Sequence, residues 1–154
     1  FIANDNSKGQ IVLSGEISAV DYISSSAKEL GVKRAIKMTV SAPFHCELIN
    51  KASRAMKEEI PNYLFNPFTV PLYSNVTSKV CNEKEIANLL VEQIISKVRW
   101  REIVENMIKD GVQNFIEIGP GNVLTNLVKR ASKDLVAISI SKIEDFDKLD
   151  NIKL

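Results

Sequence analysis

The clearest evidence for the fold class of this chain is the stretch Phe115-Ile116-Glu117-Ile118-Gly119-Pro120-Gly121-Asn122. Residues 115–118 are predicted to form a buried strand, which the Gly-Pro-Gly turn ends, and a helix is predicted over 122–131. A further strand is predicted over 135–138. The order strand, helix, strand is typical of an α/β protein with a mostly parallel sheet.

The Gly-Pro-Gly turn is also a candidate ligand site. Strand-to-helix turns at the carboxyl edge of a parallel sheet often bind ligands, and glycines there let the backbone approach closely. This turn lacks the third glycine of a dinucleotide fingerprint and the Lys-Ser/Thr of a P-loop. A structural turn is therefore the favoured interpretation, and an independent phosphate-binding domain is the weakest one.

The rest of the chain alternates between strand and helix patterns. Its apolar spacing and its turn residues place most of the boundaries. The expected elements are a strand over 10–13, a helix over 17–30 closed by Gly31, a strand over 35–40, a helix after His45 that breaks at Pro61, a strand over 69–73, helices over 83–96 and 100–110, and a short charged helix or frayed tail over 143–154.

The composition is that of an ordinary globular protein of one domain, or of one domain plus a part. The chain has 154 residues, of which 45% are apolar and 25% charged, and a formal net charge of +1. This charge gives no electrostatic argument for nucleic acid, and no apolar run approaches the ~20 residues of a membrane span. Because the chain opens on Phe1 without an initiator methionine, we expect it to begin inside a longer protein.

The two cysteines, Cys46 and Cys81, are far apart in the sequence. We expect both to be reduced, as in a cytoplasmic protein, rather than to form a disulfide framework. With a single histidine they offer no ligand pair at the spacing of a zinc site, so no metal is predicted.

The only histidine, His45, lies in the stretch Ser41-Ala42-Pro43-Phe44-His45-Cys46. Pro43 biases its predecessor towards an extended backbone, and a helix with Leu48, Ala52, Ala55 and Met56 on one face is predicted to follow. At a helix N-terminus the dipole disfavours an imidazolium, and a neutral ring can accept a proton. His45 is therefore the candidate general base; the alternative is a structural cap or a satisfied buried ring.

A nucleophile to partner His45 is not found in the sequence. No serine is flanked by the glycines of a Gly-x-Ser-x-Gly elbow, and Cys46 is adjacent to His45, a spacing at which helical side chains do not face each other. If His45 is catalytic, its nucleophile lies outside this chain.

Gln93 falls on the apolar face of its predicted helix, with Ile86, Leu90 and Ile94. A buried amide must be hydrogen-bonded, so Gln93 is expected to contact a polar site or the end of a backbone segment. The alternative is a side chain at the rim of the stripe, in water.

Several runs of the sequence share their order and spacing with one known family, from Asn4 to about Arg130. They are Asn4–Gly15, Lys33–Ala35, Val40–His45, Asn66–Asn75, Val91–Gln93, Val98–Trp100 and Glu117–Thr125. On these runs the chain resembles the C-terminal half of the malonyl-CoA:acyl carrier protein transacylases. These acyltransferases load malonyl groups in type II fatty acid synthesis.

The resemblance implies an α/β-hydrolase-like large subdomain with an inserted ferredoxin-like subdomain. Residues 1–40 would be the closing part of the inserted subdomain, and residues 41–154 the C-terminal part of the large one. The serine nucleophile, the oxyanion hole and the arginine that pairs with the malonyl carboxylate all belong to the N-terminal half in this family. The chain alone is therefore expected to be inactive.

The resemblance also implies roles for individual residues. His45 matches the catalytic histidine, and Gln93 matches a glutamine whose backbone carbonyl orients that histidine. Asn4 and Asn6 match asparagines near the acyl and pantetheine side of the cleft. Phe44 is a candidate for narrowing the pocket against α-branched acyl groups.

The implied reaction transfers a malonyl group from malonyl-CoA to the phosphopantetheine thiol of acyl carrier protein, in fatty acid biosynthesis. CoA thioester and phosphopantetheine are substrates, so no cofactor is expected. The basic pairs Lys33-Arg34 and Lys129-Arg130 could receive the acidic carrier protein, or they could be solvated charges at helix ends. The competing function is a non-catalytic α/β binding module, or an inert fragment.

Overall fold

The computed structural model describes residues 1–63 and 66–152. Its strands are β1 (Ile2–Ser7), β2 (Gln10–Leu13), β3 (Leu72–Tyr73), β4 (Val80–Cys81), β5 (Asn114–Ile118) and β6 (Val136–Ile140). Its helices are α1 (Ile17–Ser25), α2 (Asn50–Glu59), α3 (Ile86–Glu92), α4 (Trp100–Lys109) and α5 (Val123–Ala131), with 3-10 helices η1 (Glu47–Ile49), η2 (Ile60–Asn62) and η3 (Ile143–Asn151). None of these helices is long and apolar enough to cross a membrane.

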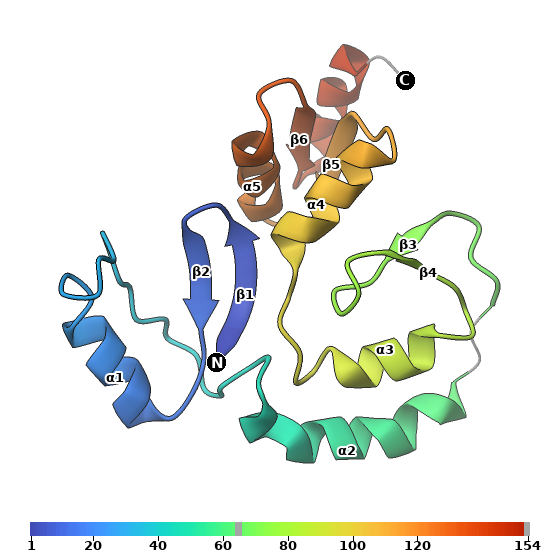
Figure 1. Cartoon of the computed structure of the whole chain (residues 1–154). Helices are drawn as coiled ribbons and strands as arrows, with labels where there is room; N and C mark the ends of the chain where they lie inside the picture. The colour runs from blue at the N-terminus through green and yellow to red at the C-terminus, as the bar shows by residue number, and fades with distance from the viewer. Residues whose placement is uncertain (64–65, 153–154) are drawn as a thin grey trace.

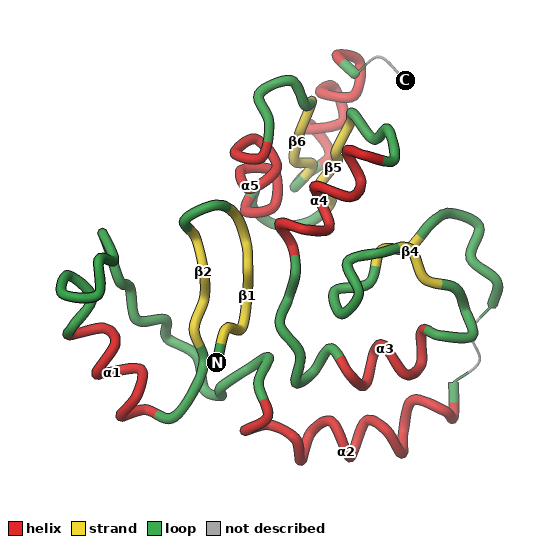
Figure 2. Tube along the Cα trace, viewed as in Figure 1, coloured by secondary structure: helices red, strands yellow, loops and turns green. Residues whose placement is uncertain are grey.

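The elements form a lobe with several extensions around it. In Figure 1, β5 and β6 lie with α4 and α5 at the top, and the β1–β2 hairpin stands between this lobe and α1. Helices α2 and α3 pack against each other along the bottom of the view, and the β3–β4 hairpin stands above α3. The tube in Figure 2 shows how much loop connects these elements.

The strand, helix and strand predicted around the Gly-Pro-Gly turn are confirmed. Strand β5 pairs with β6 in parallel, from Asn114 opposite Val136 to Ile118 opposite Ile140, and α5 makes the crossover between them. The core of this lobe is built on Val104 of α4, Val128 of α5 and Ala137 of β6. Packed against this core are Trp100, Ile108, Phe115 and Leu135.

The expected mostly parallel sheet is wrong for the described residues. They form three two-stranded sheets, of which only β5–β6 is parallel. Strands β1 and β2 form an antiparallel hairpin whose turn is Lys8-Gly9, where Gly9 has a φ of +78° that favours glycine. Sequence patterns identify strands but not their partners, and β1 and β4 are too polar or too short to give a pattern at all.

The strand predicted over 35–40 is also wrong. These residues have no regular structure and their side chains are exposed, although Lys37 forms an ion pair with Asp21 at 2.6 Å. Alternating polarity gives a strand only where a sheet edge accepts it. The helix predicted over 17–30 ends at Ser25, and Gly31 closes the turns that follow with a φ of +74°.

Other boundaries shift by a few residues. The strand over 69–73 is reduced to β3, because Pro71 has no N–H for a ladder. The helix predicted over 83–96 is α3 followed by turns, and the expected charged helix near the C-terminus is η3. Residues 153 and 154, also assigned to it, lie outside the described residues.

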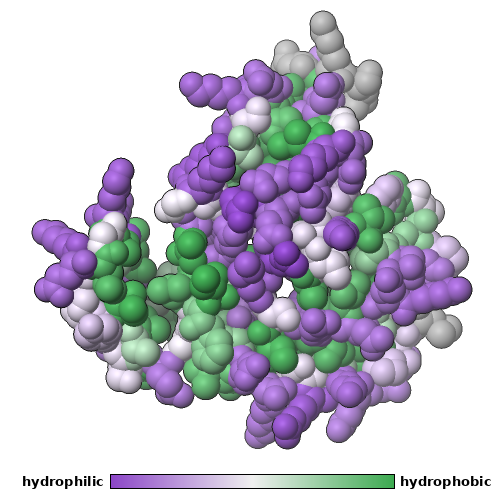
Figure 3. All heavy atoms as spheres, viewed as in Figure 1, coloured by the Kyte–Doolittle hydropathy of each residue, from purple (hydrophilic) through white to green (hydrophobic). Residues whose placement is uncertain are grey.

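Two predicted apolar faces are exposed. The helix expected directly after His45 begins as the short 3-10 helix η1, and α2 starts only at Asn50, so His45 is not at the N-terminus of α2. The expected end before Pro61 is confirmed for α2. The side chains of Leu48, Ala52, Ala55 and Met56 are exposed, and α2 contacts α3 through the buried Ser53. Strand β5 was expected to be buried, yet Ile116 and Ile118 are exposed. Figure 3 shows that apolar side chains also gather over the β1–β2 hairpin and α1, where Ile11, Leu13 and Ile17 are exposed.

Candidate active site

His45 lies in a tight turn that ends two residues before η1. Its φ is +59°, a left-handed conformation that costs roughly 1 kcal/mol for a residue with a side chain. The next residue, Cys46, anchors this turn: its side chain is buried and its Sγ donates to the carbonyl oxygen of Pro43 at 3.1 Å. The half-buried imidazole of His45 is thus held on a fixed backbone.

The imidazole contacts the main chain of Gln93. His45 Nδ1 lies 3.1 Å from the carbonyl oxygen of Gln93, 48 residues along the chain. Gln93 follows the last residue of α3 and donates its own N–H to Leu89 at 2.9 Å, but its carbonyl belongs to the helix end, where no intrahelical donor remains. This is the contact between His45 and Gln93 that the family resemblance implies.

This contact sets which ring nitrogen is free. A carbonyl oxygen can only accept a hydrogen bond, so Nδ1 of His45 carries the hydrogen when the ring is neutral. The lone pair is then on Nε2, away from Gln93. The arrangement can accept a proton at Nε2, as a general base requires.

The side chain of Gln93 has a partner that the sequence did not reveal. Its Oε1 accepts a hydrogen bond from Nδ2 of Asn75, in the turn between β3 and β4, at 3.4 Å. The expectation that the Gln93 amide meets a polar group is confirmed, since it is half-buried and bonded. Asn75 ends one of the runs that match the family, but no local pattern marks it as part of the site.

Asn4 and Asn6 lie on β1, half-buried, with no side-chain hydrogen bond to His45 in the part of the chain described. Their strand is joined to the segment that follows Gln93: Val98 donates its N–H to the carbonyl of Ala3 at 2.8 Å, and Asp5 donates its N–H to Val98 at 2.9 Å. The structure therefore brings Phe44, His45 and Gln93 together, and places the two asparagines on an adjoining strand.

Asp5 fixes β1 to α4. Its carboxylate accepts three hydrogen bonds from Nε and Nη2 of Arg101, the shortest at 2.7 Å. These hydrogen bonds hold the pKa of the Asp5 carboxyl below its usual value, with partial burial acting against them. Phe44, beside His45, is 48% exposed, and it lines neither the cavity between α2 and α3 nor the one beside the β3–β4 hairpin.

The main-chain N–H groups that follow the Gly-Pro-Gly turn are bound by a carboxylate of the same chain. The carboxylate of Glu117 accepts hydrogen bonds from the N–H groups of Leu124 at 3.1 Å and Thr125 at 2.8 Å, in the first turn of α5. Partial burial raises the pKa of Glu117, but these N–H groups outweigh it and the pKa lies below its usual value. The donors that would bind an anion are taken, which favours the structural interpretation of the turn.

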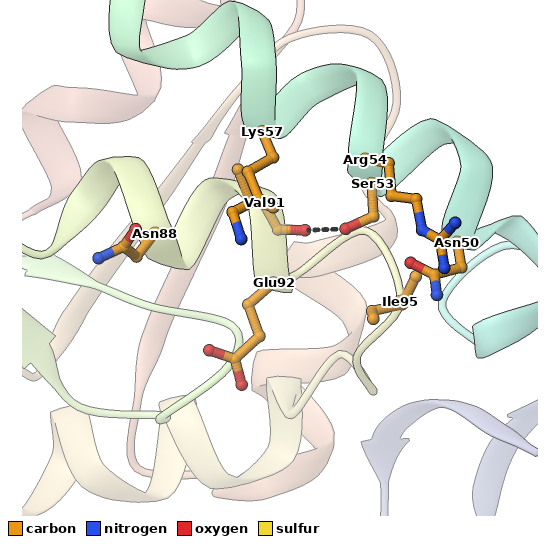
Figure 4. A pocket seen from close by; sticks show the side chains of 8 residues that line it. All are labelled: Asn50, Ser53, Arg54, Lys57, Asn88, Val91, Glu92 and Ile95. Atoms are coloured by element: carbon orange, nitrogen blue, oxygen red, sulfur yellow. Dashed lines mark hydrogen bonds between the residues drawn. The ribbon is translucent and has the colours of Figure 1, made fainter.

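A cavity of about 420 Å³ lies between α2 and α3 (Figure 4). Across it, Ser53 Oγ donates to the carbonyl of Val91 at 3.3 Å, and the cationic side chains of Arg54 and Lys57 line one side. Neither His45 nor Gln93 lines it. It is a groove between two helices, separate from the imidazole.

Cys46 and Cys81 are free and buried, as expected for reduced cysteines. Within residues 1–63 and 66–152 no group of three or more His, Cys, Asp or Glu side chains is placed to hold a metal ion.

No protein-family model matches this chain, but individual proteins do. It is 44% identical over 147 residues to a malonyl CoA-acyl carrier protein transacylase of Bacillus subtilis, covering 95% of this chain and 46% of the relative. The Escherichia coli K12 transacylase is 39% identical over 140 residues, which cover 90% of this chain and 45% of the relative. The chain thus spans about half the length of the curated relatives it matches.

Solved structures give the same result. An acyl-carrier-protein-S-malonyltransferase from Bartonella henselae superposes with a TM-score of 0.91 and 40% identity, over 98% of this chain and 48% of the other. A malonyl-transacylase in complex with a type II PKS acyl-carrier protein gives a TM-score of 0.92 at 35% identity, with 50% of that chain covered. The resemblance inferred from the sequence is confirmed, and this chain corresponds over nearly its whole length to about half of a malonyl-CoA:acyl carrier protein transacylase.

Proposed function

We propose that this chain supplies the general base of a malonyl-CoA:acyl carrier protein transacylase of fatty acid biosynthesis. The observation that supports this most directly is the 3.1 Å contact from His45 Nδ1 to the Gln93 carbonyl, which leaves Nε2 to accept a proton. The serine nucleophile is supplied by the other half of the enzyme. The chain by itself transfers nothing, because a base without a nucleophile forms no acyl intermediate.

In the first step, Nε2 of His45 takes the proton of the serine hydroxyl as its oxygen attacks the thioester carbonyl of malonyl-CoA. The carbon–sulfur bond then breaks, and the imidazolium returns the proton to the departing CoA thiolate. The Gln93 carbonyl keeps the ring oriented and faces its positive charge, the role that a carboxylate has in Ser-His-Asp enzymes.

In the second step, Nε2 of His45 removes the proton of the phosphopantetheine thiol. The thiolate attacks the malonyl-serine ester, the ester bond breaks, and His45 returns the proton to the serine oxygen. Malonyl-CoA and the carrier thiol are both substrates, so the reaction requires no cofactor. Asn4 and Asn6 on β1 contact the acyl and pantetheine groups in this proposal, and Phe44 borders the acyl pocket.

The subdomains follow from the same family. Residues 1–40 are proposed as the closing part of a ferredoxin-like subdomain, and residues 41–154 as part of an α/β-hydrolase-like one. The partner proposed for the product side is acyl carrier protein, because one of the similar transacylases was solved in complex with such a protein. Two free, buried thiols support the cytoplasm as its compartment.

A chimera tests this function. The half of the Bacillus subtilis transacylase that matches this chain is replaced by the chain, and malonyl transfer from malonyl-CoA to acyl carrier protein is followed by mass spectrometry of the carrier. We expect malonyl-carrier protein to accumulate. A chimera that is folded by circular dichroism and does not transfer malonyl would contradict the proposal.

A further inference from the structure

The turn between β3 and β4 places one asparagine against the site. Nδ2 of Asn75 donates to Oε1 of Gln93 at 3.4 Å, and the main-chain oxygen of the same Gln93 is the partner of His45. Gln93 therefore links the two residues: its side chain bonds to Asn75 and its main chain bonds to the imidazole. Asn75 is half-buried and makes no hydrogen bond to the ring in the described structure.

The turn between β3 and β4 that carries Asn75 is closed by main-chain hydrogen bonds. Within the turn, Ser74 donates its N–H to Lys79 at 2.9 Å and receives the N–H of Ser78 at 2.9 Å. Both serines are buried. The Asn75 amide is thus presented by a closed, hydrogen-bonded turn.

Helix α4 and Arg99, the residue just before it, hold the same turn from outside. Arg99 Nη1 donates to the carbonyl of Val76 at 3.1 Å, and Asn106 Nδ2 donates to the carbonyl of Ser78 at 2.8 Å. The guanidinium of Arg99 is itself paired with Glu102. The position of Asn75 is therefore set by α4, whose side chains Val104, Trp100 and Ile108 belong to the core of the upper lobe.

Gln93 needs such support because of where it lies. It follows α3, a helix of seven residues, and the ends of short helices fray. Its N–H bond to Leu89 fixes one side of the residue, but the peptide that carries its carbonyl lies beyond the helix. The bond from Asn75 gives the residue a second attachment.

We propose that Asn75 is a positioning residue for His45. By holding the Gln93 side chain, it keeps the Gln93 carbonyl pointed at Nδ1 and so keeps the neutral ring in the form with a free Nε2. The proposal rests on the proposed function for its catalytic meaning, but the ring geometry can be measured without any reaction.

The test uses the full 154-residue chain labelled with ¹⁵N. His45 is its only histidine, so a spectrum that correlates ring nitrogens with ring protons reports one imidazole without assignment. At a pH where the ring is neutral, we expect the wild-type ring to carry its hydrogen mainly on Nδ1. In Asn75→Ala the two nitrogen shifts should move towards each other, because the ring now exchanges between both forms.

Two further variants complete the design. Gln93→Leu keeps the backbone carbonyl but removes the acceptor of Asn75, and should change the nitrogen shifts as Asn75→Ala does. Asn88→Ala removes an exposed asparagine of α3 that no described contact links to the ring, and should leave the shifts unchanged. The amide spectrum of each sample shows whether the variant is folded. If Asn75→Ala does not fold, Gln93→Leu tests the same hydrogen bond.

The proposal is overturned if the wild-type ring shows no preference for Nδ1–H, or if a folded Asn75→Ala or Gln93→Leu chain keeps the wild-type shifts. In the Bacillus subtilis chimera, Asn75→Ala should lower kcat by up to about 100-fold and leave KM for malonyl-CoA nearly unchanged. A chimera that transfers nothing would count against the proposed function, whereas the nitrogen shifts judge Asn75 independently.

Discussion

At the scale of single residues, the turn around His45 uses an unfavourable backbone to place a ring. The left-handed φ of His45 is compensated locally by the burial of Cys46 and its bond to Pro43. Phe44, on the other side of the histidine, is exposed instead of packed. Its side chain is therefore available to whatever occupies the space beside the imidazole.

Phe44→Ser should widen the acyl pocket of the proposed enzyme. In the Bacillus subtilis chimera, we expect the ratio of methylmalonyl to malonyl transfer to rise by roughly 10-fold, since one methyl group in an apolar pocket changes selectivity by that order. The measurement is a competition between the two CoA esters with mass analysis of the carrier. Leu48→Ser, which removes a nearby side chain of similar exposure, is the control; an equal ratio in the Phe44 variant and this control would contradict the role of Phe44.

At the scale of elements, the sequence predicts best where one segment carries its own pattern. Helices α4 and α5 and strand β2 lie where the apolar spacing places them, because each presents a regular face or ends at a glycine turn. The false strand over 35–40 and the missed β1 fail for one reason: strands need partners, and pairing is a long-range property.

The site shows the same division. His45 can be selected from the sequence because it is the only histidine and follows Pro43. Its pairing with the Gln93 carbonyl came from family resemblance, since no spacing reveals a contact across 48 residues. Asn75 and the cap from Glu117 to α5 depend on tertiary placement, so the sequence pattern did not identify them.

Glu117→Gln should destabilise the β5–α5–β6 unit by about 1 kcal/mol at pH 7, the usual contribution of a side chain that caps a helix. The pKa of Glu117 is lowered in the folded chain, so its stabilising effect is full above the unfolded pKa and is lost as the pH falls through the folded pKa. Urea unfolding at pH 7 and at pH 3 measures this difference between variant and wild type.

The difference in the free energy of unfolding between wild type and Glu117→Gln should be smaller at pH 3 than at pH 7. Glu144→Gln is the matched control, because Glu144 is 73% exposed and has only a 3.8 Å pair with Lys142. If Glu117→Gln is as stable as wild type at pH 7, or if its loss of stability is larger at pH 3, the carboxylate does not cap α5.

At the scale of the whole molecule, the chain leaves many apolar side chains uncovered. They include Ile116 and Ile118 on β5, Ile11 and Leu13 on β2, and Ile17 on α1. Exposed apolar area of this kind marks surfaces that associate with other protein. In the proposed enzyme, the other half of the fold would cover them.

Ile118→Lys should therefore make the isolated chain more monomeric. Ile118 is 83% exposed and shares a face of β5 with the exposed Ile116, so a charge there makes that face less apolar without disturbing the core. Sedimentation velocity at several concentrations measures the change. Ile143→Lys, at an equally exposed residue of η3, is the control; the same association for both variants would exclude the β5 face as the contact.

The basic pair Lys129-Arg130 at the end of α5 tests the docking of the carrier protein. Reversing both charges should lower kcat/KM for acyl carrier protein in the chimera at low salt, and the loss should shrink as salt screens the attraction. Reversal of Lys33-Arg34 is measured alongside it. If a charge-reversed variant and wild type have equal rates at both salt concentrations, that basic pair does not dock the carrier protein.

The most direct measurement is malonyl transfer to acyl carrier protein by the Bacillus subtilis chimera with His45→Ala. If His45 is the base, kcat/KM should fall by about 10²–10⁴-fold while the circular dichroism spectrum is unchanged. Transfer by His45→Ala at the rate of the unmodified chimera would contradict the account.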